Sequence, residues 1–554
     1  MQLLFTTITF IIIFTTLYSY GLVISKNIYN NKFLDIFFKI LIGYTFIGML
    51  TLVIHFFFKI NNLISFLIIA LAIIFFVLSY FKNHKKEFLT IIFLIILLSP
   101  LFYGYSDHPI DANMYHHPYI SYLKSEKIIF GIANIQFRFG HISFLQYVQS
   151  ALTNDYLHMI SISSINIVFY ISFIFFISKK IFNQKKFNYV FLINILIASF
   201  LLIKFARYRE YGNDLIPLLV GFYFFIQILE TLGSNKTYQK NLINLALPFC
   251  AFMFAHKISY TFSVLIFLVL IDFKKLNFFK EINFRYFLVF CVILIPWLLK
   301  NYITTSCFVY PIEISCLSNS LYELSGLANP SSASFLTEVW SKGFIDHPDW
   351  RNLDLKEYMS GFNWVSTWMS GHFIKILEIM SPLFFISFLI FFYLFINKKS
   401  FENKKTFYNF KKKYTYLWFL IFVGLFIWFY KAPIYRYGAF YIISITVLSF
   451  IIFLDYFFRS KISINLKFFK NIFLISLVFF ALKNTLRIYK SDNSFFPKTI
   501  YDTNKIEFKN FYTEDLKMLA VHSGVCYYTK SICSHEIPSG IKVKKLKNYY
   551  ILTQ

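Results

Sequence analysis

The stretch YSDHPIDANMYHHPYISY, residues 105–122, concentrates side chains capable of acid–base chemistry directly after an apolar run without charge. Pro109 suits the first turn of a helix, which places Asp111 and Tyr115 four residues apart on one helical face. Asp111 is therefore a candidate general base. Asp107 stands at the helix entrance, where it either caps the helix or shares the task of Asp111.

The histidines of this stretch allow a metal site as an alternative. His108 and Asp111 are three residues apart, and His116 and His117 follow closely. No spacing here compels metal binding, so the metal is unknown, and a divalent cation, Mg²⁺ or Mn²⁺, is the one cofactor left open. We expect His116 instead to orient a neighbouring group through a hydrogen bond.

Single cations occur in the other polar segments, each next to the end of an apolar segment. Cations so placed can bind a phosphate and stabilise the charge on a leaving group, while a carboxylate takes the proton of an attacking hydroxyl. Each cation alone is equally consistent with an anchor to lipid headgroups. Together they predict a site for a lipid-linked phosphate donor. The cations are Arg138, Arg207, Arg209, Lys257, Lys300 and Arg436.

The elements that must position these residues are membrane helices. The chain has 554 residues, of which 58% are hydrophobic and 15% charged. Several apolar runs approach the length of about 20 residues that crosses a bilayer, which predicts an all-α polytopic membrane protein with about fourteen transmembrane helices. The predicted segments are 2–24, 36–58, 62–81, 88–105, 158–178, 187–204, 215–232, 242–255, 258–271, 286–299, 376–396, 415–430, 440–457 and 471–486.

Charge sets the predicted orientation. The formal net charge is +27, but the basic residues gather in short loops between apolar segments. We therefore expect them to orient the chain among the lipids of a bacterial cytoplasmic (inner) membrane, with Lys-rich loops such as KNHKKE inside, and we expect no nucleic-acid binding. The first segment lacks a basic leader and is expected to remain as a helix with an external N-terminus.

The orientation alternates consistently only if the stretch 242–271 crosses twice. It is then a hairpin of two short helices with His256 and Lys257 at its external tip, whereas one long helix with a snorkelling lysine is the alternative.

Long external segments divide the chain. We predict N-terminal membrane helices over 1–87, a membrane core over 88–486 with external loops 106–157 and 300–375, and a small external C-terminal α/β appendage over 487–554. Two close cysteine pairs fall in the external segments, where disulfides persist. Chance spacing and metal binding stay open as alternatives for these pairs, Cys307 with Cys316 and Cys526 with Cys533.

Several segments resemble, in order, those of bacterial membrane glycosyltransferases of the GT-C type. DANMYHHPYISYLKSEKIIFGIANIQFRFGHISF resembles the family's first external loop, in which an Asp is followed four residues later by Tyr, then His, and further on by Gly-x-x-Asn and Arg. IPWLLKNYITTSCFVYP resembles the entry to the second large loop, FNWVSTWMSGHF the end of that loop, and APIYRYGAF a Pro-x-x-Arg motif. These segments are scattered over about residues 88–440.

The resemblance implies a fold with catalysis on the external, periplasmic face. Such enzymes transfer a sugar from a polyprenyl-phosphate donor to a glycan, lipid or protein acceptor of the cell envelope, usually with inversion. The alternatives are an O-antigen polymerase or ligase and a transporter or flippase of lipid-linked sugar.

The resemblance also assigns roles. Asp111 is expected to be the base, and Ala112 follows it where better known members have a second acidic residue. Asp107 or Asp214 is then expected to supply a second carboxylate. Expected phosphate or acceptor contacts come from Arg138, Arg207, Lys257, His372 and Arg436.

Overall fold

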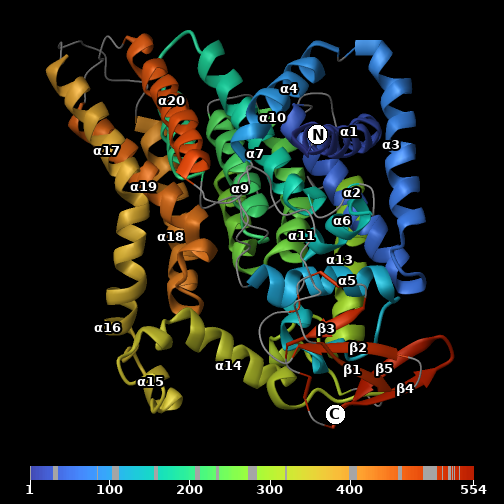
Figure 1. Ribbon diagram of the computed structural model, residues 1–554. Helices are drawn as coiled ribbons and strands as arrows, with labels where there is room; N and C mark the ends of the chain where they lie inside the picture. Colours follow the sequence, from blue (N-terminus) through green and yellow to red (C-terminus); the bar gives the residue numbers. More distant parts are fainter. Residues whose placement is uncertain are drawn as a thin grey trace.

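Long helices make up most of the chain (Figure 1). The structure, a computed structural model, describes residues 2–28, 35–83, 85–102, 111–141, 143–154, 157, 160–205, 212–232, 236–271, 283–318, 321–397, 408–458, 465–490, 508–513, 516–521, 526, 528, 529, 531–535, 537, 538 and 540–553. The long elements are α1 (Gln2–Ile28), α2 (Ile36–Phe57), α3 (Asn62–Asn83), α4 (Lys85–Leu98), α7 (Ile160–Asn183), α8 (Tyr189–Ile203), α9 (Leu215–Thr231), α11 (Ala246–His256), η7 (Ile258–Leu270), α13 (Phe284–Thr305), α17 (Ile374–Ile396), α18 (Tyr408–Lys431), α19 (Tyr435–Phe457) and α20 (Leu466–Lys490).

Shorter helices connect them. They are η2 (Ser99–Phe102), η3 (Ala112–His116), α5 (His117–Ser125), η4 (Ile132–Asn134), η5 (Phe137–His141), α6 (Phe144–Leu152), α10 (Lys236–Asn244), η9 (Glu313–Ser315), η10 (Gly326–Ala328), α14 (Pro330–Ser341), η11 (Phe344–Asp346), α15 (Leu355–Met359), α16 (Val365–Trp368) and η12 (Met369–Phe373).

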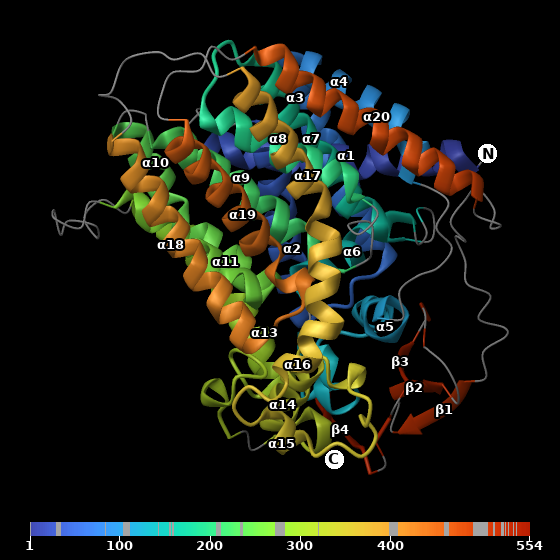
Figure 2. The ribbon, with the colours of Figure 1, turned by 90° about the vertical axis from the view of Figure 1, so that its left-hand side faces the viewer.

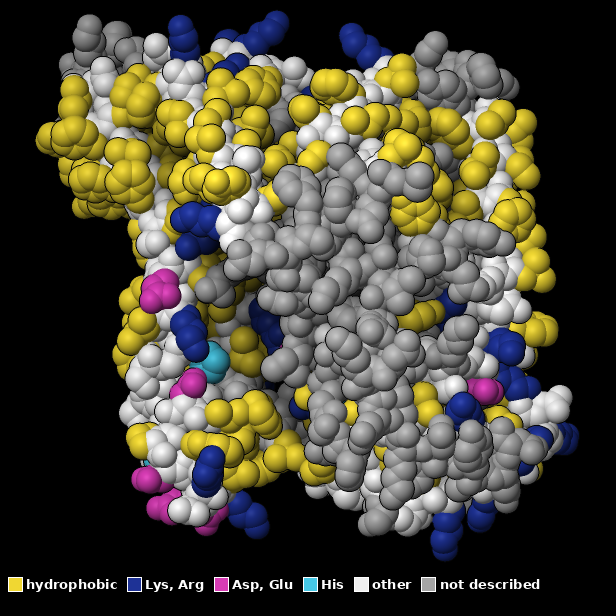
Figure 3. All heavy atoms as spheres, viewed as in Figure 1, with side chains coloured by type: hydrophobic (Ala, Val, Ile, Leu, Met, Phe, Trp, Pro, Cys, Tyr) yellow, Lys and Arg dark blue, Asp and Glu magenta, His cyan; other side chains and the backbone are white. Residues whose placement is uncertain are grey.

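Each of the predicted apolar segments overlaps one of the long elements. Among the described residues, eight helices are long and apolar enough to cross a membrane, and four shorter apolar helices accompany them. Side chains such as Phe385, Phe388 and Phe392 of α17 are exposed, and hydrophobic side chains cover much of the upper part of the surface seen in Figure 3. Apolar surface of this kind requires lipid around it, so the chain is a multi-pass membrane protein.

The first helix lies across its neighbours. A Cβ at Gly21 of α1 would lie 1.7 Å from the carbonyl oxygen of Lys39, and one at Gly43 of α2 would lie 1.8 Å from that of Leu17. Only glycine permits this close crossing of the two backbones. Figures 1 and 2 together show α1 running across the direction of α3 and α17.

The predicted hairpin at 242–271 is confirmed. Helix α11 ends and η7 begins on either side of Lys257, whose backbone is extended with φ −156° and ψ 107°. The rings of Phe249 and Phe267 lie 5.5 Å apart, so the two arms pack against each other in opposite directions. A single long helix is therefore excluded.

The described residues after α20 form the strands of the predicted C-terminal α/β appendage, but no helix. Strand β1 (Phe508–Thr513) is antiparallel to β2 (Leu516–Val521), which is parallel to β3 (Ile532–Ser534), and β4 (Lys542–Leu546) pairs with β5 (Tyr549–Thr553). The described part of the segment after α20 contains no helix. Buried and exposed side chains alternate over the first three residues of β2, as in a strand with one covered face.

These strands pack on the loop 106–157, predicted to be external, at one end of the bundle (Figure 1). The backbone nitrogen of Phe130 donates to the carbonyl oxygen of Tyr550 at 3.0 Å, and that of Leu552 donates to the carbonyl of Phe130 at 2.9 Å. Both predicted cysteine pairs, Cys307 with Cys316 and Cys526 with Cys533, form disulfides.

A chain that ends at Lys490 should loosen the first external loop. We expect the amide of Phe130 to exchange with deuterium about tenfold faster, because its acceptor on β5 is gone. The amide of Gly131 is the control, because it donates to Ile303 of α13 at 3.1 Å. Residue-resolved hydrogen exchange measures both, and equal acceleration of the two amides would contradict a local role for β5.

Candidate functional site

Four charged side chains from four separate segments meet in one ionic cluster, defined here as Asp111, Asp214, Lys257 and Arg436. A guanidinium nitrogen of Arg436 lies 3.3 Å from Oδ2 of Asp111, and its Nε lies 3.9 Å from Oδ2 of Asp214. Nζ of Lys257 lies 2.8 Å from Oδ1 of Asp214 and donates to Oδ1 of Asn213 at 3.1 Å. The cluster is thus a chain of alternating charges: Arg436 lies between the two carboxylates, and Lys257 lies on the far side of Asp214.

Helix ends supply all four members. Asp111 immediately precedes the π-helical turn η3 and makes no capping hydrogen bond, so its carboxylate is not used by its own helix. Asp214 immediately precedes α9, Lys257 forms the turn between α11 and η7, and Arg436 is in the first turn of α19. At membrane depth, a break in a helix exposes polar backbone groups. Such breaks are tolerated where they are buried in protein or line a site, and not where they face lipid.

The site is recessed into the membrane part of the fold. Nε2 of His256, next to Lys257, lies 2.8 Å from the hydroxyl of Tyr44, which belongs to the middle of α2. A helix of 17 residues such as α9 spans about 26 Å, less than the about 30 Å of a bilayer's hydrocarbon. The cluster can therefore lie below the level reached by the longer helices.

The turn before α19 is held by two tryptophans. Nε1 of Trp368 donates to the carbonyl of Pro433 at 2.7 Å, and Nε1 of Trp428 donates to that of Ile434 at 2.8 Å. The hydroxyl of Tyr260 donates to the carbonyl of Arg436 at 2.7 Å. The segments FNWVSTWMSGHF and APIYRYGAF, both of which resemble GT-C segments, are thus in contact through Trp368 and Pro433. These hydrogen bonds fix the start of α19.

Burial divides the cluster into two parts. The side chains of Asp214 and Lys257 are 22% and 18% exposed, whereas those of Asp111 and Arg436 are both 41% exposed. Burial alone would raise the pKa of Asp214, but the charges of Lys257 and Arg436 outweigh it and lower that pKa. Asp214 is therefore ionised and paired, while the carboxylate of Asp111 remains accessible.

Arg138 lies beside the cluster as an additional cation. Its guanidinium carbon is 5.7 Å from the ring centre of Tyr115, and one guanidinium nitrogen lies 3.3 Å from the sulfur of Met114. Within the described residues Arg138 has no carboxylate at ion-pair distance. Burial, followed by the charge of Asp111, raises the pKa of Tyr115, so the phenol keeps its proton.

Two functional contacts were missed by sequence reasoning. The ring centre of Tyr437 lies 4.2 Å from Nζ of Lys257 and 5.3 Å from the guanidinium carbon of Arg436, so one ring contacts both cations. Asn213 completes the surroundings of Lys257. In the sequence, only their positions, Tyr437 directly after Arg436 and Asn213 directly before Asp214, could have indicated these contacts.

His116 is held by a hydrogen bond with Gln146. The side-chain oxygen of Gln146 accepts from Ser143, so its amide nitrogen faces Nδ1 of His116 at 2.6 Å. Nδ1 then accepts, and the neutral ring carries its proton on Nε2. Burial lowers the pKa of His116 to about 4 and that of His141 to about 3.

Acidification should therefore destabilise the fold. Both histidines are neutral when folded, so their stabilising effect is complete above about pH 6.5 and is lost as the pH falls towards 4, by about 3 kcal/mol for His116. We expect His116→Asn, whose oxygen can still accept from Gln146, to lose less melting temperature between pH 7 and pH 5 than the wild type does. An unchanged acid dependence would contradict the neutral His116.

The remaining predicted residues lie elsewhere. His372 and Asp346 both border Gly343, and no ion pair among the described residues joins His372 to the cluster. Lys300 is buried on α13, where Nζ lies 3.1 Å from Oδ1 of Asn301. Within the described residues no three His, Cys, Asp or Glu side chains lie close enough to hold a metal. The predicted residues Asp107, His108, Arg207 and Arg209 lie outside the described residues.

Comparisons with known proteins give one match. Residues 3–443 match the family described as Domain of unknown function (DUF8201), a range that contains every member of the ionic cluster. No curated protein and no solved structure matches the chain. Because the match covers more than half of its length, this multi-pass helical membrane protein belongs to the DUF8201 family.

Proposed function

We propose that the protein is a membrane glycosyltransferase of the GT-C type, which transfers a sugar from a polyprenyl-phosphate donor to a glycan, lipid or protein acceptor of the cell envelope. The observation that carries the proposal is the ion pair between the accessible carboxylate of Asp111 and Arg436, at 3.3 Å. A base and a phosphate-binding cation in direct contact are the two groups that this transfer needs.

The proposed reaction is a single displacement. The acceptor oxygen attacks the anomeric carbon of the donor, the bond from that carbon to the phosphate oxygen breaks, and the configuration inverts. The acceptor proton passes to the carboxylate of Asp111. Polyprenyl phosphate leaves with its electron pair, and Arg436 and Arg138 meet the charge that develops on it.

The ion pairs within the cluster support these separate roles for Asp111 and Arg436. Arg436 is shared between Asp111 and Asp214, so a donor phosphate that takes one guanidinium edge leaves the carboxylate of Asp111 free to accept a proton. In this proposal Lys257 keeps its ion pair with Asp214, at 2.8 Å, and its positive charge adds to the field that attracts the phosphate. The phenol of Tyr115, which keeps its proton, can donate a hydrogen bond to either substrate.

Location supports a lipid-linked donor. The cluster is placed at helix ends that belong to the end of the bundle predicted to be external, and it is recessed to the middle of α2. A polyprenyl chain remains in the bilayer while its phosphate reaches such a depth, and a water-soluble acceptor enters from outside. Whether Mg²⁺ or Mn²⁺ assists is open in this proposal.

The test is turnover in proteoliposomes that contain short-chain polyprenyl-phosphate sugars and a pool of cell-envelope acceptors. We expect release of polyprenyl phosphate together with a new glycosidic bond of inverted configuration, read by mass spectrometry and NMR. Sugar moved across the bilayer without any bond cleavage would establish the flippase alternative. Elongation of a lipid-linked glycan block by another block would establish the polymerase alternative.

A further inference from the structure

A separate polar cavity lies at the other end of α9, the helix that begins next to Asp214 of the cluster. Helix α9 begins after Asp214 and ends near Glu230, which lines this cavity, so the two sites are a helix length apart. The cavity has a volume of about 680 Å³ and is formed by the first turns of α2 and α8, the last turns of α7 and α9, and Glu87 of α4. This size is in the range of small-molecule sites.

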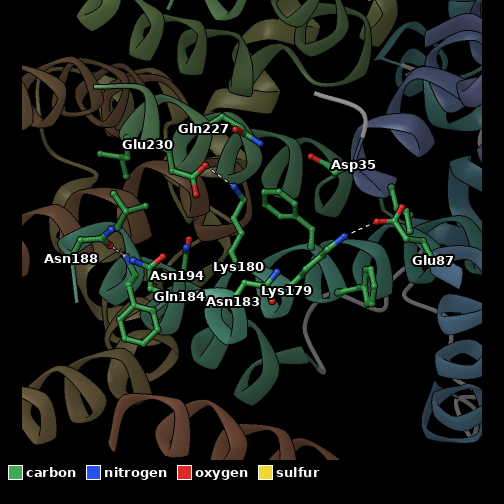
Figure 4. Close-up of a pocket in the computed structure, with 16 residues that line it drawn as sticks. Asp35, Glu87, Lys179, Lys180, Asn183, Gln184, Asn188, Asn194, Gln227 and Glu230 are labelled. Atoms are coloured by element: carbon green, nitrogen blue, oxygen red, sulfur yellow. Dashed lines mark hydrogen bonds and ion pairs between the residues drawn. The ribbon is translucent and has the colours of Figure 1, made fainter. Parts of the chain in front are cut away.

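One buried amide side chain lines this cavity. Asn194 of α8 is 3% exposed, and within the described part of the chain its Oδ1 has no hydrogen-bond partner. Figure 4 shows Asn194 among Lys180, Gln184 and Asn188, inside the cavity. Buried polar atoms are normally paired, so an amide in a cavity wall whose oxygen is unpaired can accept from the O–H or N–H of a ligand once its side chain turns toward the cavity.

The lysines of the cavity are already neutralised. Nζ of Lys180 lies 2.5 Å from Oε2 of Glu230, and Nζ of Lys179 lies 2.6 Å from Oε1 of Glu87 (Figure 4). Asp35 adds a third carboxylate to the lining. Acidic groups therefore outnumber cations, which disfavours a phosphate or another anion.

The rest of the lining suits hydroxyl groups. Asn183 and Gln227 add further amides, and an amide side chain carries a donor and an acceptor side by side, as two neighbouring hydroxyls require. The rings of Phe175, Phe176 and Phe191 supply apolar surface for the C–H face of a ring. A cavity lined by amides, carboxylates and aromatic rings is suited to an uncharged polyol.

We propose that this cavity, at the end of the bundle predicted to be cytoplasmic, binds an uncharged polyhydroxylated group, a sugar ring, through Asn194 and Gln227. The same chemistry is offered by a free sugar and by the sugar head of a lipid. The proposal does not rest on the proposed function, because it involves neither Asp111 nor Arg436.

The test measures binding to the full chain in phosphatidylcholine nanodiscs prepared without glycosidic detergents, which would themselves occupy the cavity. The probes are glucose, N-acetylglucosamine, octyl glucoside below its micellar concentration, octyl phosphate and octylammonium. Saturation-transfer NMR reports contact, and the shift of melting temperature reports affinity. We expect binding of a sugar probe. Equal affinity for glucose and octyl glucoside identifies a free sugar, whereas preference for octyl glucoside identifies a lipid head.

Matched variants connect binding to the cavity. Asn194→Leu should weaken sugar binding about tenfold, because it removes a hydrogen-bonding group, while the empty protein keeps or gains melting temperature, because an unpaired amide is replaced by an apolar group of similar size. Gln227→Leu should also weaken sugar binding and serves if Asn194→Leu does not fold. Asn484→Leu, which replaces a buried amide of α20 outside the cavity lining, should leave the affinity unchanged.

Three results would overturn the proposal: no sugar probe binds, sugar binding survives both leucine variants of the cavity, or the leucine variants abolish binding of octyl phosphate or octylammonium instead. Failure of the transferase assay with intact, Asn194-dependent sugar binding would reject the proposed function alone.

Discussion

Asp111→Asn should lower kcat of sugar transfer by about 10²–10⁴-fold, the usual contribution of a positioned base, with little change in the KM for the donor. Asparagine keeps the shape and one acceptor oxygen for Arg436 at the position of Oδ2 but cannot take a proton at neutral pH. The measurement is release of polyprenyl phosphate in proteoliposomes together with the glycan profile of cells that carry the variant.

The same variant should fold normally. The side chains of Asp111 and Arg436 are both 41% exposed, and exposed ion pairs contribute less than about 1 kcal/mol, so the melting temperature and protein level should match the wild type. Asp349→Asn is the control, because Asp349 is an exposed carboxylate of the second external loop. An unchanged glycan at normal protein level would rule out Asp111 as the base.

Asp214→Asn should destabilise the folded protein by about 3 kcal/mol, because it leaves Lys257 buried without its partner. It also removes the carboxylate that lies 3.9 Å from Nε of Arg436. The measurement is the thermal or denaturant midpoint in a fixed detergent. We expect the double variant Asp214→Asn with Lys257→Met to recover much of the loss, because it removes both charges.

An exposed ion pair provides the control for that loss. Lys179 and Glu87 lie 2.6 Å apart with side chains 53% and 34% exposed, so Glu87→Gln should cost less than about 1 kcal/mol. If Glu87→Gln and Asp214→Asn destabilised the protein equally, or if the double variant were no more stable than Asp214→Asn alone, the cluster would not be held together by its buried pair.

Sequence patterns predicted the helices well for a physical reason. A membrane segment must satisfy its backbone hydrogen bonds within itself, so a long apolar run specifies a helix without knowledge of its neighbours. The hairpin at 242–271 followed from charge alternation alone, and the cysteine pairs followed from short separations in external segments. The strands after α20 were predicted in kind, but their pairing with Phe130 depends on a contact between residues far apart in the chain.

The candidate site was predicted only as a set of residues. Asp111, Lys257, Arg436 and Arg138 were expected to converge, and the fold does bring them together. Their pairing was not predictable, since Asp214 was assigned only a secondary role yet joins both Lys257 and Arg436. His372 was assigned to the same site, but it lies with Asp346.

Amino-acid order alone thus accounts for which segments are helical, which loops carry isolated charges and which cysteines lie within reach of each other, because these depend on neighbours along the chain. The ionic cluster and the cavity around Asn194 depend on packing between distant segments. At Gly48, a Cβ would lie 2.2 Å from the ring of Phe144, and at Gly438 another would lie 2.4 Å from that of Trp428. Such close contacts set the depth and rotation of each helix, and only that arrangement determines which charges meet.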